Sequence, residues 1–136
     1  MGFEIIEHTA DIGIHATGED LSEAFQEAAK GMSSIMTDIE KVNKTEIFKV
    51  ELESEEWDEL LVDFLSELIY LHEVEDVLFS DFDVTLKSNE IKELHATLKG
   101  ERIDLDKHKF FTEIKAVSYH DILADPVGEV KVIFDV

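Results

Sequence analysis

The stretch 3-FEIIEHTADIGIHAT-17 contains two short apolar runs joined by a polar turn. Residues 3–6 predict one β-strand, and the alternation of apolar and polar residues in 11–17 predicts a second. A tight turn between two strands places its side chains at the rim of a sheet. His8 and Asp11 could bind a cation there, contact a partner, or simply form the turn through side-chain hydrogen bonds to the backbone.

The segment that follows predicts an amphipathic helix of about 16 residues. Asp20 is a good N-cap, and Glu23 stands three residues later, as in a capping box. Apolar residues then recur at helical spacing and would form one buried stripe: Leu21, Ala24, Phe25, Ala28, Met32, Ile35 and Met36.

A second helix is predicted after an alternating strand at 45–52. Ser54 is its expected N-cap, and acidic residues fill the first turn, where they complement the helix dipole. The helix runs to about His72. We expect it to be the central core helix, because it carries a broad apolar stripe: Trp57, Leu60, Leu61, Phe64, Leu65, Leu68 and Ile69.

The rest of the chain predicts four more strands, with a turn at 125–128: 77–86, 93–99, 113–119 and 129–135. The predicted order is β-β-α-β-α-β-β-β-β in a single domain, residues 1–136. Two helices with single apolar stripes suit one face of a largely antiparallel sheet. The predicted fold is therefore α+β, a two-layer sandwich of two amphipathic helices on a largely antiparallel mixed sheet.

The net charge of −21 and the absence of cysteine limit the classes of function. A surface this acidic repels phosphate backbones, so we expect no autonomous nucleic-acid binding, whereas divalent cations and basic proteins are favoured. Without cysteine there is no disulfide, thiolate zinc site or cysteine nucleophile. No apolar run approaches the ~20 residues that span a bilayer, and residues 1–4 lack the basic region of a signal peptide. We expect a soluble, cytoplasmic monomer without membrane contact.

Two more charged residues are candidates for a site. Asp135 follows the alternating run 129–134, and dense carboxylates at a strand end can gather a divalent cation, although a solvated strand end is the simpler interpretation. Lys115 could pair with a carboxylate, bind phosphate, or protect a sheet edge. The six histidines lack the His-x-x-x-His and H-E-x-x-H spacings of zinc sites, so oxygen ligands and Mg²⁺ or Ca²⁺ are favoured.

Six segments carry a resemblance to a known family. They are His8–Ile14 (HTADIGI), Leu21–Phe25 (LSEAF), Met36–Asp38 (MTD), Leu60–Tyr70 (LLVDFLSELIY), Lys115–His120 (KAVSYH) and Phe134–Val136 (FDV). In this order, over essentially the whole chain, they make the sequence similar to the archease family. A small departure is Ser118, which stands where the family signature has threonine.

The resemblance implies a non-enzymatic protein cofactor of the RtcB-type RNA ligase, which joins exon halves in tRNA splicing. Archeases promote guanylylation of the ligase and its multiple turnover, and they bind a divalent metal through acidic residues. Carried onto this chain, the resemblance implies Asp11 and Asp135 as metal ligands, with Asp38 as a third. It implies Lys115 as an activation residue and His8 as a supporting group. The ion would be Ca²⁺, Mg²⁺ or Mn²⁺.

Two other interpretations stay open. A chaperone-like acidic interaction module would use the Glu-rich helix surface as its interface, so reversing those charges would matter more than changing Asp11. A metal-dependent phosphoesterase would use Asp11 and Asp135 in catalysis. That enzyme needs a deep pocket and turnover by the isolated protein, and the clustered acids are few for a two-metal centre.

Overall fold

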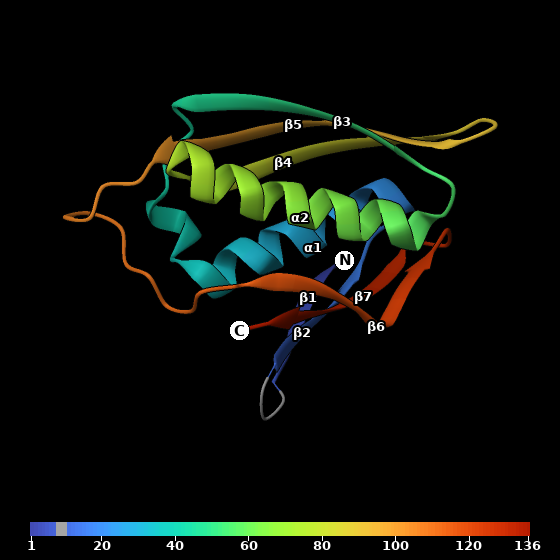
Figure 1. Ribbon diagram of the computed structural model, residues 1–136, viewed down its shortest axis with the longest axis horizontal. Coiled ribbons are helices and arrows are strands. Elements are labelled where there is room, and N and C mark those ends of the chain that lie inside the picture. The colour runs from blue at the N-terminus through green and yellow to red at the C-terminus, as the bar shows by residue number, and fades with distance from the viewer. Residues whose placement is uncertain (8–10) are drawn as a thin grey trace.

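The computed structural model describes residues 1–7 and 11–136 (Figure 1). His8, one of the predicted site residues, lies outside the described residues. Within them the elements follow one another in this order: β1 (Gly2–Glu7), β2 (Asp11–Thr17), α1 (Leu21–Met36), the short 3-10 helix η1 (Ile39–Lys41), β3 (Glu46–Ser54), α2 (Trp57–Glu75), β4 (Val77–Ser88), β5 (Lys92–Arg102), β6 (Ala116–Asp125) and β7 (Glu129–Asp135).

The strands form two antiparallel sheets, and both helices lie between them (Figure 1). The strand order is β1-β2-β7-β6 in one sheet and β3-β5-β4 in the other. The predicted α+β class, with two helices packed on antiparallel strands, is confirmed. The detail of one sheet covered on one face is corrected, because the strands divide between two sheets and the helices form a middle layer.

The helices occupy a middle layer because the buried surface of α1 is wider than a single stripe. Ala29 and Gly31 are buried in addition to the predicted apolar positions. A Cβ atom on Gly31 would lie 2.8 Å from Ile14 and 2.8 Å from Phe3, so glycine allows α1 to approach the sheet of β1 and β2 closely.

The other side of α1 meets the edge of the second sheet. β4 is an edge strand, and some of its N–H groups find no partner on β5. The Gln26 side chain accepts a hydrogen bond from Val84 N at 2.9 Å, and Ser22 Oγ accepts one from Leu86 N at 3.1 Å. Two polar side chains of α1 therefore cover this edge of β4.

The start of α1 was predictable from local sequence, whereas the start of α2 was not. Glu23 N donates to Asp20 Oδ1 at 2.8 Å, which confirms Asp20 as the N-cap. The prediction that Ser54 caps the second helix is wrong, because α2 begins at Trp57. Ser54 belongs to β3, and its hydroxyl donates to Asp63 Oδ2 of α2 at 3.0 Å.

The core lies where the two helices pack together between the sheets. Phe25 of α1 and Phe64 of α2 stack with their ring centroids 6.3 Å apart. Phe134 from one sheet and Leu98 from the other are fully buried against the same core. In the described part of the chain, no helix has both the length and the apolar composition needed to cross a membrane.

A large bulge interrupts the pairing of β6 with β7. The strand begins at Ala116, three residues later than the sequence predicted, and continues to Asp125. Residues 119–122 stand opposite Val132 alone on β7, and Asp121 adopts a left-handed backbone with φ 54°. Such a bulge bends its strand and re-aims side chains. Period-two alternation stops at the bulge, so the sequence pattern could not extend the strand beyond it.

Candidate functional site

Asp11 and Asp135 lie directly opposite one another on β2 and β7. The antiparallel register pairs them, and it pairs Ile12 with Phe134 at the next position. Directly opposed residues in an antiparallel sheet have Cβ atoms about 4.5–5.5 Å apart. Phe134 is buried in the core, so alternation places both aspartates on the outer face of the sheet, away from the helices. The prediction that the two acids lie on adjacent strands is confirmed.

Lys115 lies at the same end of this sheet. It stands one residue before β6, and its backbone N–H donates to the carbonyl oxygen of Asp135 at 2.8 Å. The side chain of Lys115 is exposed. Among the described residues, Lys115 forms no ion pair with Asp11 or Asp135. Lys115 and the two aspartates therefore lie at the same end of the sheet, and no ion pair in the described part of the chain joins the lysine to either carboxylate.

Asp11 presents a carboxylate oxygen that the described residues leave unsatisfied. Its Oδ1 atom is buried and has no hydrogen-bond partner within residues 1–7 and 11–136, whereas Asp135 opposite it is exposed. A buried carboxylate oxygen without a partner is costly, and a bound cation would remove that cost. Carboxylate oxygens are the ligands that Mg²⁺ and Ca²⁺ prefer. The pair of aspartates therefore fits a hard divalent ion.

Asp38 has a local structural role at the end of α1. It caps η1, and its Oδ1 accepts a hydrogen bond from Glu40 N at 3.2 Å. No three His, Asp or Glu side chains within the described ranges come together as a metal cluster. The structure therefore groups Asp11 with Asp135 and does not add Asp38 to them. The participation of Asp38 and His8 in metal binding stays a prediction.

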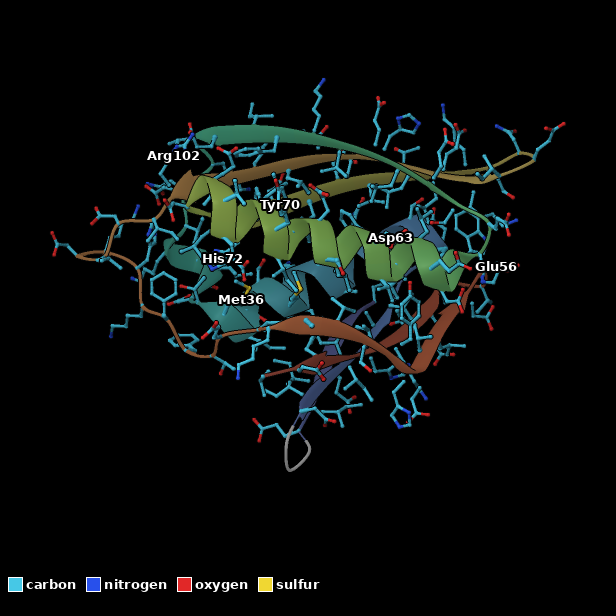
Figure 2. The ribbon with its side chains drawn as sticks, viewed as in Figure 1. Met36, Glu56, Asp63, Tyr70, His72 and Arg102 are labelled. Carbon is cyan, nitrogen blue, oxygen red and sulfur yellow. The ribbon has the colours of Figure 1, made fainter. Side chains whose placement is uncertain are left out.

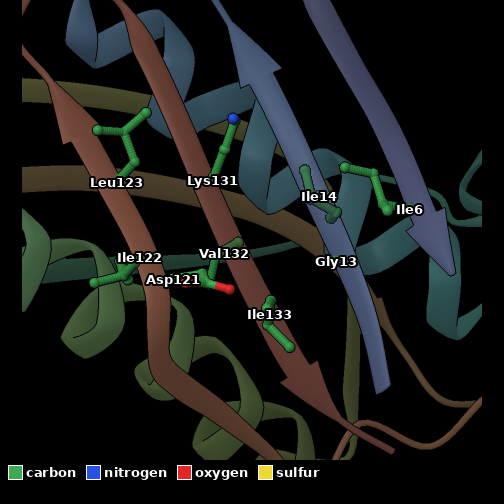
Figure 3. Close-up of a pocket in the computed structure, with 9 residues that line it drawn as sticks. All are labelled: Ile6, Gly13, Ile14, Asp121, Ile122, Leu123, Lys131, Val132 and Ile133. Carbon is green, nitrogen blue, oxygen red and sulfur yellow. The ribbon is translucent and has the colours of Figure 1, made fainter. Parts of the chain in front are cut away.

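A shallow groove of about 480 Å³ lies on the outer face beside this pair (Figure 3). Figure 3 shows Asp121 and Leu123 on one side, Ile6 on the other, and Ile133 of β7 between them. Gly13 also lines the groove, where a Cβ atom would crowd the Val132 carbonyl oxygen at 3.3 Å. Sequence reasoning missed this groove. A glycine inside a strand was the one local signal of it.

β6 packs beside α2, and the acidic residues of α2 nearest the bulge are Asp58, Glu59 and Asp63. Burial raises the pKa of Tyr119, and the negative charge of Asp63, then of Glu59 and Asp58, raises it further. These carboxylates therefore lie close enough to the bulge to act on it electrostatically.

Comparisons with known proteins agree over nearly the whole chain. Residues 3–136 match the Archease protein family (MTH1598/TM1083). The protein archease of Pyrococcus abyssi is 40% identical over 121 residues, which cover 88% of this chain and 85% of that protein. The protein archease of Methanosarcina mazei is 43% identical over 122 residues, which cover 88% of this chain and 84% of that protein.

Two solved structures share the fold. The solution structure of Methanobacterium thermoautotrophicum protein 1598 has a TM-score of 0.87 at 39% identity, with 99% of each chain covered. The crystal structure of a Thermotoga maritima archease, described as a possible chaperone, has a TM-score of 0.55 at 26% identity. That similarity covers 98% of this chain and 96% of the Thermotoga chain.

Proposed function

This chain belongs to the archease family, and from that premise we propose that it is a non-enzymatic protein cofactor of an RtcB-type RNA ligase in tRNA splicing. In this role it promotes guanylylation of the ligase and supports multiple turnover. One observation supports the proposal beyond the family resemblance: Asp11 lies opposite Asp135, and the backbone of Lys115 bonds to that of Asp135 at the same end of the sheet of β1, β2, β7 and β6.

The two aspartates would hold a divalent metal ion, Ca²⁺, Mg²⁺ or Mn²⁺. When bound, the ion supplies concentrated positive charge that attracts phosphate oxygens. The strand register fixes the spacing of Asp11 and Asp135, so the ligands need little reorganisation. Lys115 orients a carboxylate or contacts a nucleotide phosphate of the ligase complex. Asp38 and His8 are further candidate contributors, on the family resemblance alone.

The proposal is tested by measuring transfer of GMP from GTP to the ligase with Asp11→Ala and Asp135→Ala proteins. Loss of one carboxylate should weaken metal binding by about ten- to a hundred-fold, and stimulation should fall with it. Asp83→Ala is the matched control, because Asp83 is an exposed aspartate on the other sheet. Titration calorimetry with each metal measures the affinity. Full stimulation by either site variant, with unchanged metal affinity, would refute the proposal.

A chaperone-like role is the second candidate, because the Thermotoga relative is described as a possible chaperone. It would place the contact on the acidic face of α2 rather than on Asp11. Glu59→Lys in the same guanylylation assay separates the two candidates, because Glu59 is exposed whereas Asp63 accepts the hydrogen bond from Ser54. A larger loss there than with Asp11→Ala favours the chaperone-like role. A phosphoesterase would release phosphate without the ligase, and the isolated protein should release none.

A further inference from the structure

Two adjacent phenylalanines are held at the surface between β5 and β6. This connecting segment, residues 103–115, passes the ends of both helices and is the orange segment at the left of Figure 1. Phe110 is 48% exposed and Phe111 is 58% exposed. Grouped apolar surface of this kind marks contact sites, and aromatic residues dominate such contacts.

Hydrogen bonds to the end of α1 fix the backbone beneath these rings. Phe111 N donates to Met36 O at 2.9 Å, and Phe110 forms a β-bridge with Thr37. The buried hydroxyl of Thr37 donates to the carbonyl oxygen of Lys109. The two phenylalanine rings are therefore exposed on an anchored backbone, so binding a partner there costs little ordering of the chain.

A second anchor lies at the other end of the segment. The His108 side chain is fully buried; its Nδ1 accepts a hydrogen bond from Asp104 N, and its Nε2 donates to Glu101, each at 2.9 Å. Lys107 Nζ donates to both oxygens of Glu101, at 2.8 and 2.9 Å. Both ends of the exposed aromatic pair are thus tied to the folded body.

The rings border a cleft of about 460 Å³, here called the aromatic cleft, formed by Met36, His72, Phe110, Phe111 and Ile114. Figure 2 labels Met36 and His72, which come from the C-terminal ends of α1 and α2. The His72 and Phe110 rings are tilted against each other, with centroids 6.3 Å apart. Ile114 is buried and gives the cleft an apolar inner side.

The charged groups of the cleft are carboxylates, and the Thr112 hydroxyl also lines it. Glu73 and Glu113 line it with exposed carboxylates, and no lysine or arginine of the described residues lines it. His72 Nδ1 donates to the Val77 carbonyl oxygen at 2.9 Å, because a carbonyl can only accept. Flat rings combined with acceptors suit a flat, donor-rich cation.

We propose that the aromatic cleft binds an arginine side chain of a basic partner protein. A guanidinium stacks on phenylalanine and donates to carboxylates at the same time, which a compact lysine ammonium does less well. A nucleobase would also stack, but its phosphates would meet Glu73, Glu113 and a net charge of −21. The charge therefore favours a protein over RNA.

The aromatic cleft lies a short stretch of chain away from the end of the sheet that carries Asp135. Phe111 and Lys115 are four residues apart, so at most about 14 Å of chain separates them, and Lys115 N is bonded to Asp135 O. One partner could therefore cover both. The identity of that partner as the ligase rests on the proposed function, whereas the ligand chemistry of the cleft does not.

The first experiment tests the cleft without the ligase. The ¹⁵N-labelled protein is titrated with the capped peptides acetyl-Leu-Arg-Leu-amide and acetyl-Leu-Glu-Leu-amide, and with oligouridylate. We expect the arginine peptide alone to shift amide signals at 72–73 and 110–114. Phe111→Ala and Glu73→Gln should each weaken its binding about tenfold. Leu105→Ala and Glu59→Gln are matched controls, because Leu105 is 80% exposed on the same segment and Glu59 is exposed on the same helix.

Two results of the titration would overturn the inference. One is that the arginine peptide shifts none of these signals, or binds Phe111→Ala as it binds wild-type protein. The other is that oligouridylate or the glutamate peptide occupies the cleft instead.

The second experiment measures binding of the ligase to immobilised wild-type, Phe111→Ala and Leu105→Ala proteins. We expect Phe111→Ala to weaken binding about tenfold and Leu105→Ala to leave it unchanged. Equal binding by wild type and Phe111→Ala would overturn the assignment of the cleft to this partner. If wild-type protein neither binds nor stimulates the ligase, the proposed function fails, and the peptide titration still decides the chemistry of the cleft.

Discussion

Glu101 shows how one carboxylate can hold together a segment without regular secondary structure. It accepts hydrogen bonds from Lys107, from the backbone of Asn43 and from His108. The hydrogen bond from Lys107, followed by that from Asn43, lowers the pKa of Glu101 from 4.5 to about 2. A carboxyl with a lowered pKa in the folded state stabilises the fold while it is ionised.

The stability supplied by Glu101 should depend on pH in a defined direction. It is complete above pH 4.5 and is lost as the pH falls toward about 2, because protonation removes the acceptor. Glu101→Gln should therefore lower the free energy of unfolding near neutral pH, and its effect should shrink below pH 4.5. Urea unfolding of both proteins across this range measures the difference. Glu53→Gln, at an exposed glutamate of β3, is the control and should show no such trend.

The aspartate pair and the aromatic cleft differ in how far sequence could anticipate them. Asp11 and Asp135 both stand at the ends of alternating runs, so a shared sheet edge could be predicted, although only the structure gives the register that makes them direct neighbours. Phe110 and Phe111 lie in a polar stretch without periodicity, and their cleft depends on the ends of two distant helices. Nothing local in the sequence indicates that neighbourhood.

Among the elements, α1 was predictable because its signals are local. The cap and the apolar spacing lie within the helix itself, and α1 spans Leu21–Met36 as expected. α2 instead begins after Glu56, which makes no side-chain cap hydrogen bond within the described ranges, and the hydroxyl of Ser54 is used in a bond to Asp63 between the strand and the helix. The bulge of β6 depends on β7 and α2 in the same way. At the start of α2 and at the bulge of β6, contacts with other elements therefore decide the structure, and the local sequence pattern does not.

The contact between α1 and the edge of β4 makes a prediction about stability. Gln26→Ala leaves Val84 N–H without its hydrogen-bond partner, which should cost about 1–3 kcal/mol in the free energy of unfolding. Chemical denaturation measures this cost. Lys30→Ala, at an exposed position of the same helix, should cost less than about 0.5 kcal/mol. Equal losses for the two variants would mean that the Gln26 hydrogen bond does not protect the edge.

For the whole molecule, the division into two sheets was beyond single-sequence reasoning. Each strand pattern indicates a buried face but not which strand it pairs with, and one sheet was the simpler arrangement. The net charge, in contrast, could be counted directly from the sequence, and it affects the stability of the whole molecule. A net charge of −21 on 136 residues opposes the compact state through self-repulsion.

Salt should therefore stabilise this protein. Raising NaCl from about 0.01 M to about 1 M shortens the Debye length from about 30 Å to about 3 Å, so the melting temperature should rise by screening. Calorimetry at several salt concentrations measures the shift. At equal ionic strength, CaCl₂ should raise the melting temperature further than NaCl, because Ca²⁺ would also bind the aspartate pair. Asp135→Ala should abolish this additional rise. A melting temperature that stays flat or falls in NaCl would contradict the repulsion argument.

The place of β7 in its sheet has a consequence for biosynthesis. β7 follows the other described elements along the chain, yet it lies in the interior of its sheet, between β2 and β6. A nascent chain can pair β1 with β2 early, but Asp11 meets Asp135 only after residues 129–135 have been made and inserted. The aspartate pair therefore forms only after β7 has been made. A polypeptide released before residues 129–135 were made would carry Asp11 with no carboxylate opposite it. Only a chain that has been synthesised through β7 can therefore form the aspartate pair.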